Sequence, residues 1–204
     1  MTVITLSPQD EAPAGRRADI LRGALEAFTE RGYAETSIED IRARSGASIG
    51  SIYHDYRGKA DVAAALYVEG LRRYQTGAVP VLASAADAES GIRGLARYHL
   101  RWIAANRDLA RFLLTHREPE VLAASRDATR PTNDAFVAEA RRWLAEMTAR
   151  GEVGELPFDV AVAALIGPLQ EFGRLWVADI SATPVDEAAD LLGETAWRAL
   201  AAER

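Results

Sequence analysis

Apolar residues recur at helical spacing along most of this chain, and no stretch of any length alternates as a strand does. The first clear stripe lies in residues 16–31 and consists of Ile20, Leu21, Ala24, Leu25 and Phe28. Gly32 follows it and is expected to end the helix. The pattern predicts an all-α fold with about nine helices.

Two short helices with a tight turn between them are predicted directly after this stripe. Ser37 is a good N-cap, and Asp40, three residues later, gives the form of a capping box. Gly46 is the residue best able to adopt the left-handed conformation that stops the first short helix. Ser48 is a second N-cap, for a helix over residues 49–55. Helix, glycine turn and helix together make a helix-turn-helix.

The second short helix has an inward and an outward face. Ile52 and Tyr56 can face inward at i, i+4. Gly50 and Ser51 lie in its first turn, where small side chains let the backbone approach a groove and its phosphates. Glycine turns between short helices also occur in proteins that do not bind DNA, so this geometry alone leaves both interpretations open. Lys59, the only lysine, opens a longer helix that completes a compact N-terminal unit.

Residues 20–62 resemble a known domain. Their sequence includes the motifs ALEAFTERGY, TSIEDI and SGASIGSIYHDY, followed by Lys59 at the start of the next helix. Together these motifs are specific, unlike an isolated glycine turn. The segment is similar to the DNA-binding domain of the TetR family of bacterial transcriptional regulators. The resemblance implies that the second short helix enters the major groove of a palindromic operator, and that the regulator is most often a repressor.

Carried over by position, the resemblance gives the residues expected to contact DNA. They are Thr36, Ser37, Arg42, Arg44, Ser48, Ile49, Gly50, Ser51, Tyr53, His54 and Lys59. Ser37 and Ser48 could instead be caps and nothing more, and Arg42 could be merely solvated. Ile49 departs from the family, which most often has a lysine or arginine there, and could contact a thymine methyl group.

Charge is sparse for a DNA-binding protein. The formal net charge is −6 and the pI about 5.2, but residues 16–61 hold eight basic and eight acidic side chains. Such a domain is expected to bind specific sites and not to coat DNA. The absence of cysteine is consistent with the cytoplasm, and no apolar run reaches membrane-spanning length. Residues 1–15 are expected to be a disordered tail and not a signal sequence.

The remainder, residues 61–204, is expected to form a helical domain for effector binding and dimerisation, behind a DNA-binding domain over residues 16–60. Turn signals divide it at 77–80, 105–108, 118–119, 127–131, 151–157 and 181–184. Residues 160–169, VAVAALIGPL, are apolar around the whole helix, which requires burial on all sides. The last helix, over 185–202, offers the small residues Ala189, Gly193 and Ala196. Both helices could simply complete the core of a monomer, but the resemblance implies a homodimer through these two segments.

The resemblance also implies a small-molecule effector held among the middle helices. Aromatic faces with a few polar tips come from Tyr67, Tyr74, Tyr98, His99, Trp102, Phe112, His116, Phe136, Gln170 and Phe172. All of these except Tyr74 and His99 are the candidate ligand-binding residues, and only a minority is expected to touch a ligand.

Two other function classes compete with a regulator. The three histidines show no metal-binding spacing, and no nucleophile elbow or phosphate-binding glycine loop is present, which argues against an enzyme and predicts no metal and no cofactor. A helical ligand-binding protein that has lost its affinity for DNA is the other alternative. Ile49 and the neutral charge of the DNA-binding domain favour it.

Overall fold

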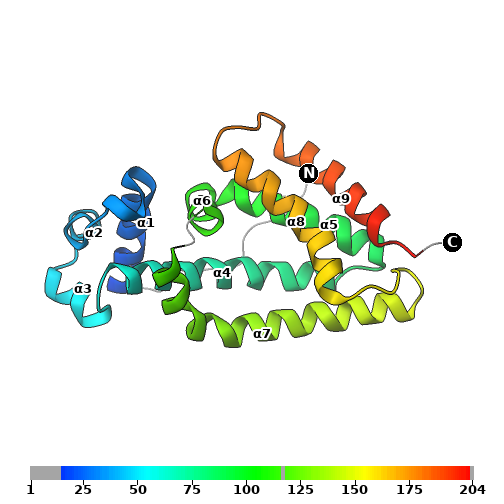
Figure 1. The fold of residues 1–204 in the computed structure, drawn as a ribbon, viewed down its shortest axis with the longest axis horizontal. Helices are drawn as coiled ribbons and strands as arrows, with labels where there is room; N and C mark the ends of the chain where they lie inside the picture. The colour runs from blue at the N-terminus through cyan, green and yellow to red at the C-terminus, as the bar shows by residue number, and fades with distance from the viewer. Residues whose placement is uncertain (1–14, 116–117, 203–204) are drawn as a thin grey trace. The chain divides into compact units, whose positions relative to one another are not determined.

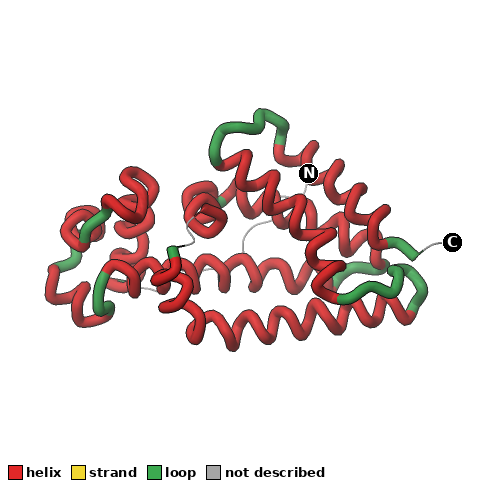
Figure 2. Tube along the Cα trace, viewed as in Figure 1, coloured by secondary structure: helices red, strands yellow, loops and turns green. Residues whose placement is uncertain are grey.

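The computed structural model describes residues 15–115 and 118–202, so most of the predicted disordered tail, residues 1–14, lies outside it. The described residues form nine α-helices and no strand. The predicted all-α fold is therefore confirmed. Figure 1 labels the helices in chain order, and Figure 2 colours helices and loops. In chain order the helices are α1 (Arg16–Glu35), α2 (Ile38–Ser45), α3 (Ile49–Asp55), α4 (Lys59–Ala83), α5 (Ala88–Ala105), α6 (Arg107–Thr115), α7 (Pro119–Ala149), α8 (Phe158–Val177) and α9 (Val185–Leu200).

The helix-turn-helix is formed by α2 and α3 as the capping residues predicted. Ser37 and Asp40 make the reciprocal bonds of a capping box at the start of α2. Gly46 ends α2 with φ 69°, in the left-handed region, and Ser48 caps α3 by accepting a hydrogen bond from the Ser51 N–H. Gly32 interrupts α1 with φ 77°, so the regular part of that helix ends where its glycine predicted.

Two of the predicted turns are wrong. Helix α4 continues through residues 77–80, and α7 continues through residues 127–131, each with a proline inside the helix. Pro80 lies in the last turn of α4, where its missing N–H removes one hydrogen bond, to the carbonyl of residue 76, without ending the helix. Gly77 has a packing role: a Cβ atom at this position would lie 2.3 Å from the Tyr98 hydroxyl oxygen. A glycine required for close packing looks the same in a sequence as a glycine that makes a turn.

The chain divides into two compact units. The first comprises residues up to Glu69 together with Glu118–Arg126, and the second comprises Gly70–Arg117 and Asp127–Arg204. The core of the first unit includes Ile20, Phe28, Ile41 and Ile52, each at most 1% exposed. These side chains come from α1, α2 and α3, so the short helices of the motif are fixed against a longer one.

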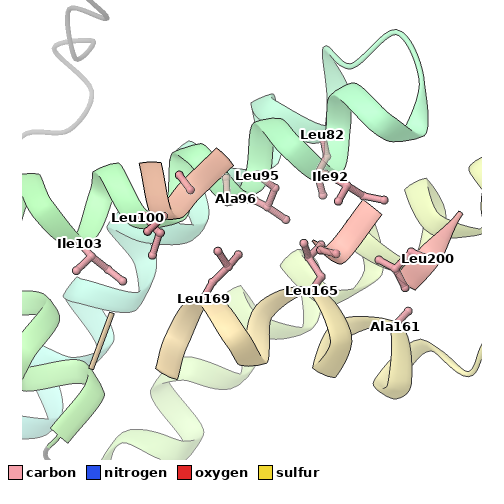
Figure 3. Close-up of a cluster of buried hydrophobic side chains, with 14 of the residues drawn as sticks. Leu82, Ile92, Leu95, Ala96, Leu100, Ile103, Ala161, Leu165, Leu169 and Leu200 are labelled. Carbon is pink, nitrogen blue, oxygen red and sulfur yellow. The ribbon is translucent and has the colours of Figure 1, made fainter. Parts of the chain in front are cut away.

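The core of the second unit lies where α5, α8 and α9 pack together. Figure 3 shows Ile92 and Leu95 of α5 facing Leu165 and Leu169 of α8. Along the outer edge of the α5 and α9 contact, three arginines of α5 pair with three acidic residues of α9. The pairs are Arg93 with Glu194, Arg97 with Asp190 and Arg101 with Asp186.

Helix α8 is buried on one side only within the chain. Ala161, Leu165 and Leu169 recur every four residues on the buried side. On the other side Val160 is 47% exposed and Val162 37% exposed. By length and composition α8 is apolar enough to cross a membrane, but core helices pass the same test. Within the described chain, α8 is thus buried on one side only, whereas its sequence predicts burial on all sides.

The small residues of α9 pack inside the chain. Ala189, Gly193 and Ala196 are all buried, and a Cβ atom on Gly193 would lie 3.2 Å from the Ala96 Cβ atom of α5. This close helix contact is therefore intramolecular. A second subunit would have to use another face of α9.

Candidate DNA-reading helix and ligand cavity

Helix α3 has one face packed against the core and an opposite face exposed to solvent. Ile52 is fully buried and Tyr56 is 6% exposed, as predicted for its inward face. On the opposite face Ile49 is 40% exposed and Tyr53 54% exposed. Gly50 lies between them and carries no Cβ atom, so the backbone of the first turn is open to close approach. A helix that exposes an isoleucine and a tyrosine while its other face is fully packed offers them for contact.

The hydroxyl groups near the motif are engaged in helix caps. Ser37 Oγ donates to Asp40 Oδ2 at 2.6 Å and accepts from the Asp40 N–H. Ser48 Oγ donates to Ser51 Oγ at 2.9 Å. The hydrogen bonds from Ser37 are the main reason why the pKa of Asp40 lies below its ordinary value. All three serines still reach solvent, so capping and a phosphate contact remain compatible for them.

Thr36 is placed differently, because it is only 2% exposed. Its hydroxyl group lies 2.7 Å from the Gly32 carbonyl oxygen and 3.2 Å from that of Ala27, and its N–H donates to the Tyr33 carbonyl. Both donors are therefore used inside the domain, where they tie the end of α1 to the start of α2.

The cations near the motif are also paired. Arg42 forms an ion pair with Glu39 at 2.6 Å, and Arg44 pairs with Glu30 while donating to the Asp40 carbonyl. Each acidic partner cancels charge that would otherwise attract phosphate. His54, exposed near the end of α3, lies 3.1 Å from an Asp55 carboxylate oxygen.

Lys59 holds the end of α1. Its ammonium group donates to the carbonyl oxygens of Tyr33 and Ala34, at 2.6 Å and 3.0 Å, and lies 4.4 Å from the centroid of the Tyr33 ring. Both carbonyls lie in the last turn of α1, where the helix itself supplies no i+4 donor. An ammonium group has three donors, so one remains after these two bonds.

A cavity of about 280 Å³ lies inside the second unit, among α4, α5, α7 and α8. Its wall is mostly aliphatic and aromatic and includes Leu95, Phe136, Leu144 and Leu165. No lysine, arginine, aspartate or glutamate lines it among the described residues. The volume is near the lower end of the roughly 300–1,000 Å³ typical of small-molecule sites.

A few polar side chains interrupt this apolar wall. The Tyr74 hydroxyl lies 2.8 Å from His99 Nδ1, and Gln75 Nε2 donates to Asn133 Oδ1 at 3.2 Å. Burial lowers the pKa of His99 to about 4, so its ring is neutral at physiological pH. Three buried atoms on the lining residues have no hydrogen-bond partner in the described chain: His99 Nε2, Gln75 Oε1 and Trp143 Nε1.

Of the candidate ligand-binding residues, only Phe136 and Gln170 line this cavity. Tyr98 and Trp102 lie one layer back, with ring centroids 5.6 Å and 5.5 Å from that of Tyr74. The others are elsewhere: Tyr67 is half-buried on α4 in the first unit, Phe112 is buried on α6, Phe172 packs against the core of the second unit, and His116 lies outside the described residues.

Sequence reasoning missed several polar residues of the wall. Tyr74 and His99 belong to the aromatic set but not to the candidate ligand-binding residues, and the sequence pattern does not predict Gln75, Asn133 or Trp143 as ligand contacts. Gln75 carried a usable signal, since a polar residue one position after Tyr74 falls among apolar neighbours of a long helix. Asn133 gave no such signal, because it follows the polar stretch at residues 127–132.

Comparison with known proteins agrees with this architecture. Residues 20–66 match the family model of bacterial regulatory proteins of the tetR family. No protein among those with curated descriptions matches the chain.

Solved structures of low sequence identity share the fold. A TetR family transcription regulator from Marinobacter aquaeolei VT8 aligns with a TM-score of 0.75 at 18% identity, over 92% of this chain and 96% of that one. The fatty acid degradation regulator FadR from Bacillus halodurans aligns with a TM-score of 0.78 at 20% identity, over 92% and 97%. FadR from Bacillus subtilis, in complex with stearoyl-CoA, aligns with a TM-score of 0.74 at 20% identity, over 87% and 96%. The chain therefore carries, in residues 20–66, the helix-turn-helix DNA-binding domain of TetR-family transcription regulators, and its described part has the fold of those regulators.

Proposed function

We propose that this protein is a homodimeric repressor that acts in the cytoplasm, binds a palindromic operator with α3 of each protomer, and leaves it when a small molecule fills the cavity. The observation that carries the proposal is the outward face of α3, where Ile49 and Tyr53 are exposed on a helix whose other face is packed. The family match over residues 20–66 supports the assignment of this face to DNA.

The composition of the reading face indicates how it would discriminate. Ile49 can contact a thymine methyl group in the major groove, and Gly50 lets the helix backbone approach closely. Tyr53 offers a hydroxyl group to a phosphate. Because Arg42 and Arg44 are paired with acidic residues, long-range attraction to DNA is weak and shape and base contacts must supply more of the affinity.

The exposed side of α8 supports the dimer. Val160 and Val162 are exposed there, and Ala163 and Gly167 add small residues that allow a second helix to come close. A Cβ atom on Gly167 would meet nothing within 4 Å in this chain. A palindromic operator requires two reading helices related by a twofold axis, which a dimer through this face provides.

The cavity supports the effector. It is lined mainly by apolar side chains and has polar atoms without partners, as a binding site for a small molecule does. The similar FadR from Bacillus subtilis was solved in complex with stearoyl-CoA, which supports a ligand-regulated mechanism for the fold. An effector would release the operator by binding more tightly to the conformation with low DNA affinity.

The test is selection of binding sites from random duplex DNA at low salt, followed by measurement of affinity for the selected site. We expect a palindrome with thymine steps, and we expect Ile49→Ala to weaken binding about tenfold, because each methylene lost from an apolar contact with a thymine methyl group is worth about 0.8 kcal/mol. Ala145→Ser, a comparably small change at an exposed position of α7, is the matched control and should bind as the unmodified protein does.

The same selection addresses the alternative, a ligand-binding protein without DNA affinity. The pairing of Arg42 with Glu39 and of Arg44 with Glu30 favours that alternative, because it removes free positive charge beside α3. Failure to enrich any sequence at low salt, with folded protein, would establish it and reject the regulator.

A further inference from the structure

The unpartnered polar atoms of the cavity restrict the chemistry of its ligand. Gln75 is 3% exposed and His99 5% exposed, and neither Gln75 Oε1 nor His99 Nε2 has a partner in the described chain. A buried polar atom without a hydrogen bond costs about 1–3 kcal/mol. A ligand that pairs with both atoms recovers this free energy, so the cavity favours a ligand with matching groups.

The wall also selects against charge. Its residues carry no formal charge, and the His99 ring is neutral because burial lowers its pKa to about 4. A carboxylate or phosphate moved into this cavity would lose its hydration and meet no cation. The ligand group that lies inside must therefore be uncharged.

The hydrogen-bond roles of the two atoms can be assigned from Tyr74. The Tyr74 phenol keeps its proton, because burial raises its pKa, and its one hydrogen-bond partner within the described residues is His99 Nδ1, 2.8 Å away, so the phenol donates there. The ring hydrogen of the neutral imidazole then lies on Nε2, which becomes a donor. Gln75 Oε1 is an acceptor, because the amide nitrogen of Gln75 already donates to Asn133. One donor and one acceptor together match a hydroxyl group, which accepts from the first and donates to the second.

The two ends of the cavity differ. Gln75 bonds Asn133 on α7, whereas Trp143 is ten residues further along that helix, about 15 Å away at 1.5 Å per residue. Trp143 packs where α5 begins, since a Cβ atom on Gly91 would lie 2.4 Å from its ring. Between these ends the wall is formed by residues such as Leu95 and Leu165. The end at Gln75 is therefore joined to a long apolar section, and that section ends at Trp143, whose Nε1 is a single unpartnered donor.

We propose that the effector is an uncharged, elongated and mainly apolar alcohol or phenol, whose hydroxyl group bonds His99 and Gln75 while its hydrocarbon part extends toward Trp143. This inference rests on the proposed function, because it names the ligand class of the cavity assigned there to the effector. It concerns the chemistry of binding and does not depend on the operator.

The test compares three probes that differ only in the polar group: 4-hexylphenol, hexylbenzene and 4-hexylbenzoate. Each is titrated into the full chain near pH 7.5 by calorimetry, with stearoyl-CoA as a fourth, charged ligand. We expect the phenol to bind about tenfold more tightly than hexylbenzene, as two hydrogen bonds require, and more tightly than the benzoate. Equal binding of phenol and hydrocarbon, tighter binding of the benzoate or of stearoyl-CoA, or no binding of the phenol overturns the proposal.

Paired variants locate the hydroxyl contact. Gln75→Leu removes the acceptor, and we expect the ratio of the phenol and hexylbenzene dissociation constants to fall to within about threefold of unity. Thr195→Leu replaces an exposed polar side chain of α9 that does not line the cavity, and it should preserve the ratio. The ratio is a better measure than either constant, because a general loosening of the cavity affects both probes. A preserved ratio in Gln75→Leu overturns the assignment.

Failure of this proposal can be told apart from failure of the proposed function. Binding of the phenol without any selected operator rejects the repressor and leaves the ligand class intact. The opposite outcome is a selected operator together with no binding of the phenol and no effect of the phenol on the operator complex. That outcome rejects the ligand class and leaves the DNA-reading role intact.

Discussion

The hydroxyl oxygen of Tyr74 lies 2.8 Å from Nδ1 of His99, with the two rings edge to face at a centroid distance of 5.2 Å. The pair joins α4 to α5 across the interior of the second unit. Both groups keep their neutral forms, because burial raises the pKa of the phenol and lowers that of the imidazole. The contact is therefore a neutral hydrogen bond, and protonation of His99 would remove Nδ1 as an acceptor and place a charge in the buried interior.

The free energy of unfolding should fall as the pH drops through the range in which His99 takes up a proton in the unfolded chain but not in the folded one. The folded pKa is about 4 and the unfolded value 6.5, so the unfolded chain binds one more proton between these values. The free energy of unfolding should decrease by about 1.4 kcal/mol per pH unit from His99 alone, or roughly 3 kcal/mol from pH 6.5 to 4. Urea unfolding at several pH values measures this slope.

Protonation of carboxylates whose pKa values are lowered in the folded state also reduces the free energy of unfolding in acid. A variant is therefore needed to separate the contribution of His99 from theirs. His99→Gln keeps a neutral polar side chain but cannot gain a proton. We expect its stability to depend less on pH between 4.5 and 6.5 than that of the unmodified protein. Equal slopes would show that His99 is not the responsible group.

The sequence was sufficient where structure depends on neighbours along the chain. The Ser37 cap, the Gly46 stop and the Ser48 cap each act within four residues, so their chemistry alone predicts the bounds of α2 and α3. It was insufficient at Gly77 and Pro80, because the reason for that glycine is Tyr98, which lies on another helix.

Gly23 is required by close approach of α1 and α2. A Cβ atom there would lie 2.6 Å from the backbone nitrogen of Ser45 and 2.9 Å from its Cα atom, and backbone cannot move aside cheaply. We expect Gly23→Ala to lower the free energy of unfolding by about 1–3 kcal/mol despite the better helix propensity of alanine. Thermal unfolding followed by circular dichroism measures the change.

Gly50→Ala provides the contrast on α3, where only the Ser48 side chain, at 4.0 Å, is near the added methyl group. This variant should be as stable as the unmodified protein or slightly more so, but should bind the selected operator more weakly, because the methyl group holds the helix away from the groove. Unchanged affinity in Gly50→Ala would argue against close approach of this turn to DNA.

Lys59 is expected to have two separable roles. Lys59→Met removes the bonds to the Tyr33 and Ala34 carbonyls and should lower the free energy of unfolding by about 1 kcal/mol. If its third donor holds a phosphate, the slope of log affinity against log salt should also flatten by about one unit per protomer. Arg57→Met, which removes an exposed cation paired with Asp61, is the control for net charge. A slope changed equally by both variants would leave Lys59 with its structural role alone.

The cavity shows why the functional site was harder to predict than the fold. Tyr74, Gln75 and His99 come from two helices, and Trp143 from a third, so their proximity follows from tertiary packing and from no local pattern. Periodicity places an aromatic residue on an inward face but does not decide between the wall of a cavity and filled core. Phe112, fully packed on α6, and Phe136, at the cavity, have the same signature in the sequence.

The proposed dimer interface on the exposed side of α8 can be tested by introducing a single charged side chain there. Val160 is 47% exposed in the single chain, and in the proposed dimer it would be buried against the partner subunit. Val160→Arg should convert a dimer into a monomer at micromolar concentration, because an unpaired guanidinium in an apolar interface costs several kcal/mol. Ala145→Arg adds the same charge at an exposed position of α7 and should leave the dimer intact. Sedimentation equilibrium distinguishes the two.

The charge at Val160 leaves α3 unchanged, so affinity for a single half-site should persist while affinity for the palindrome falls. A dimeric Val160→Arg protein would exclude this face of α8 as the interface.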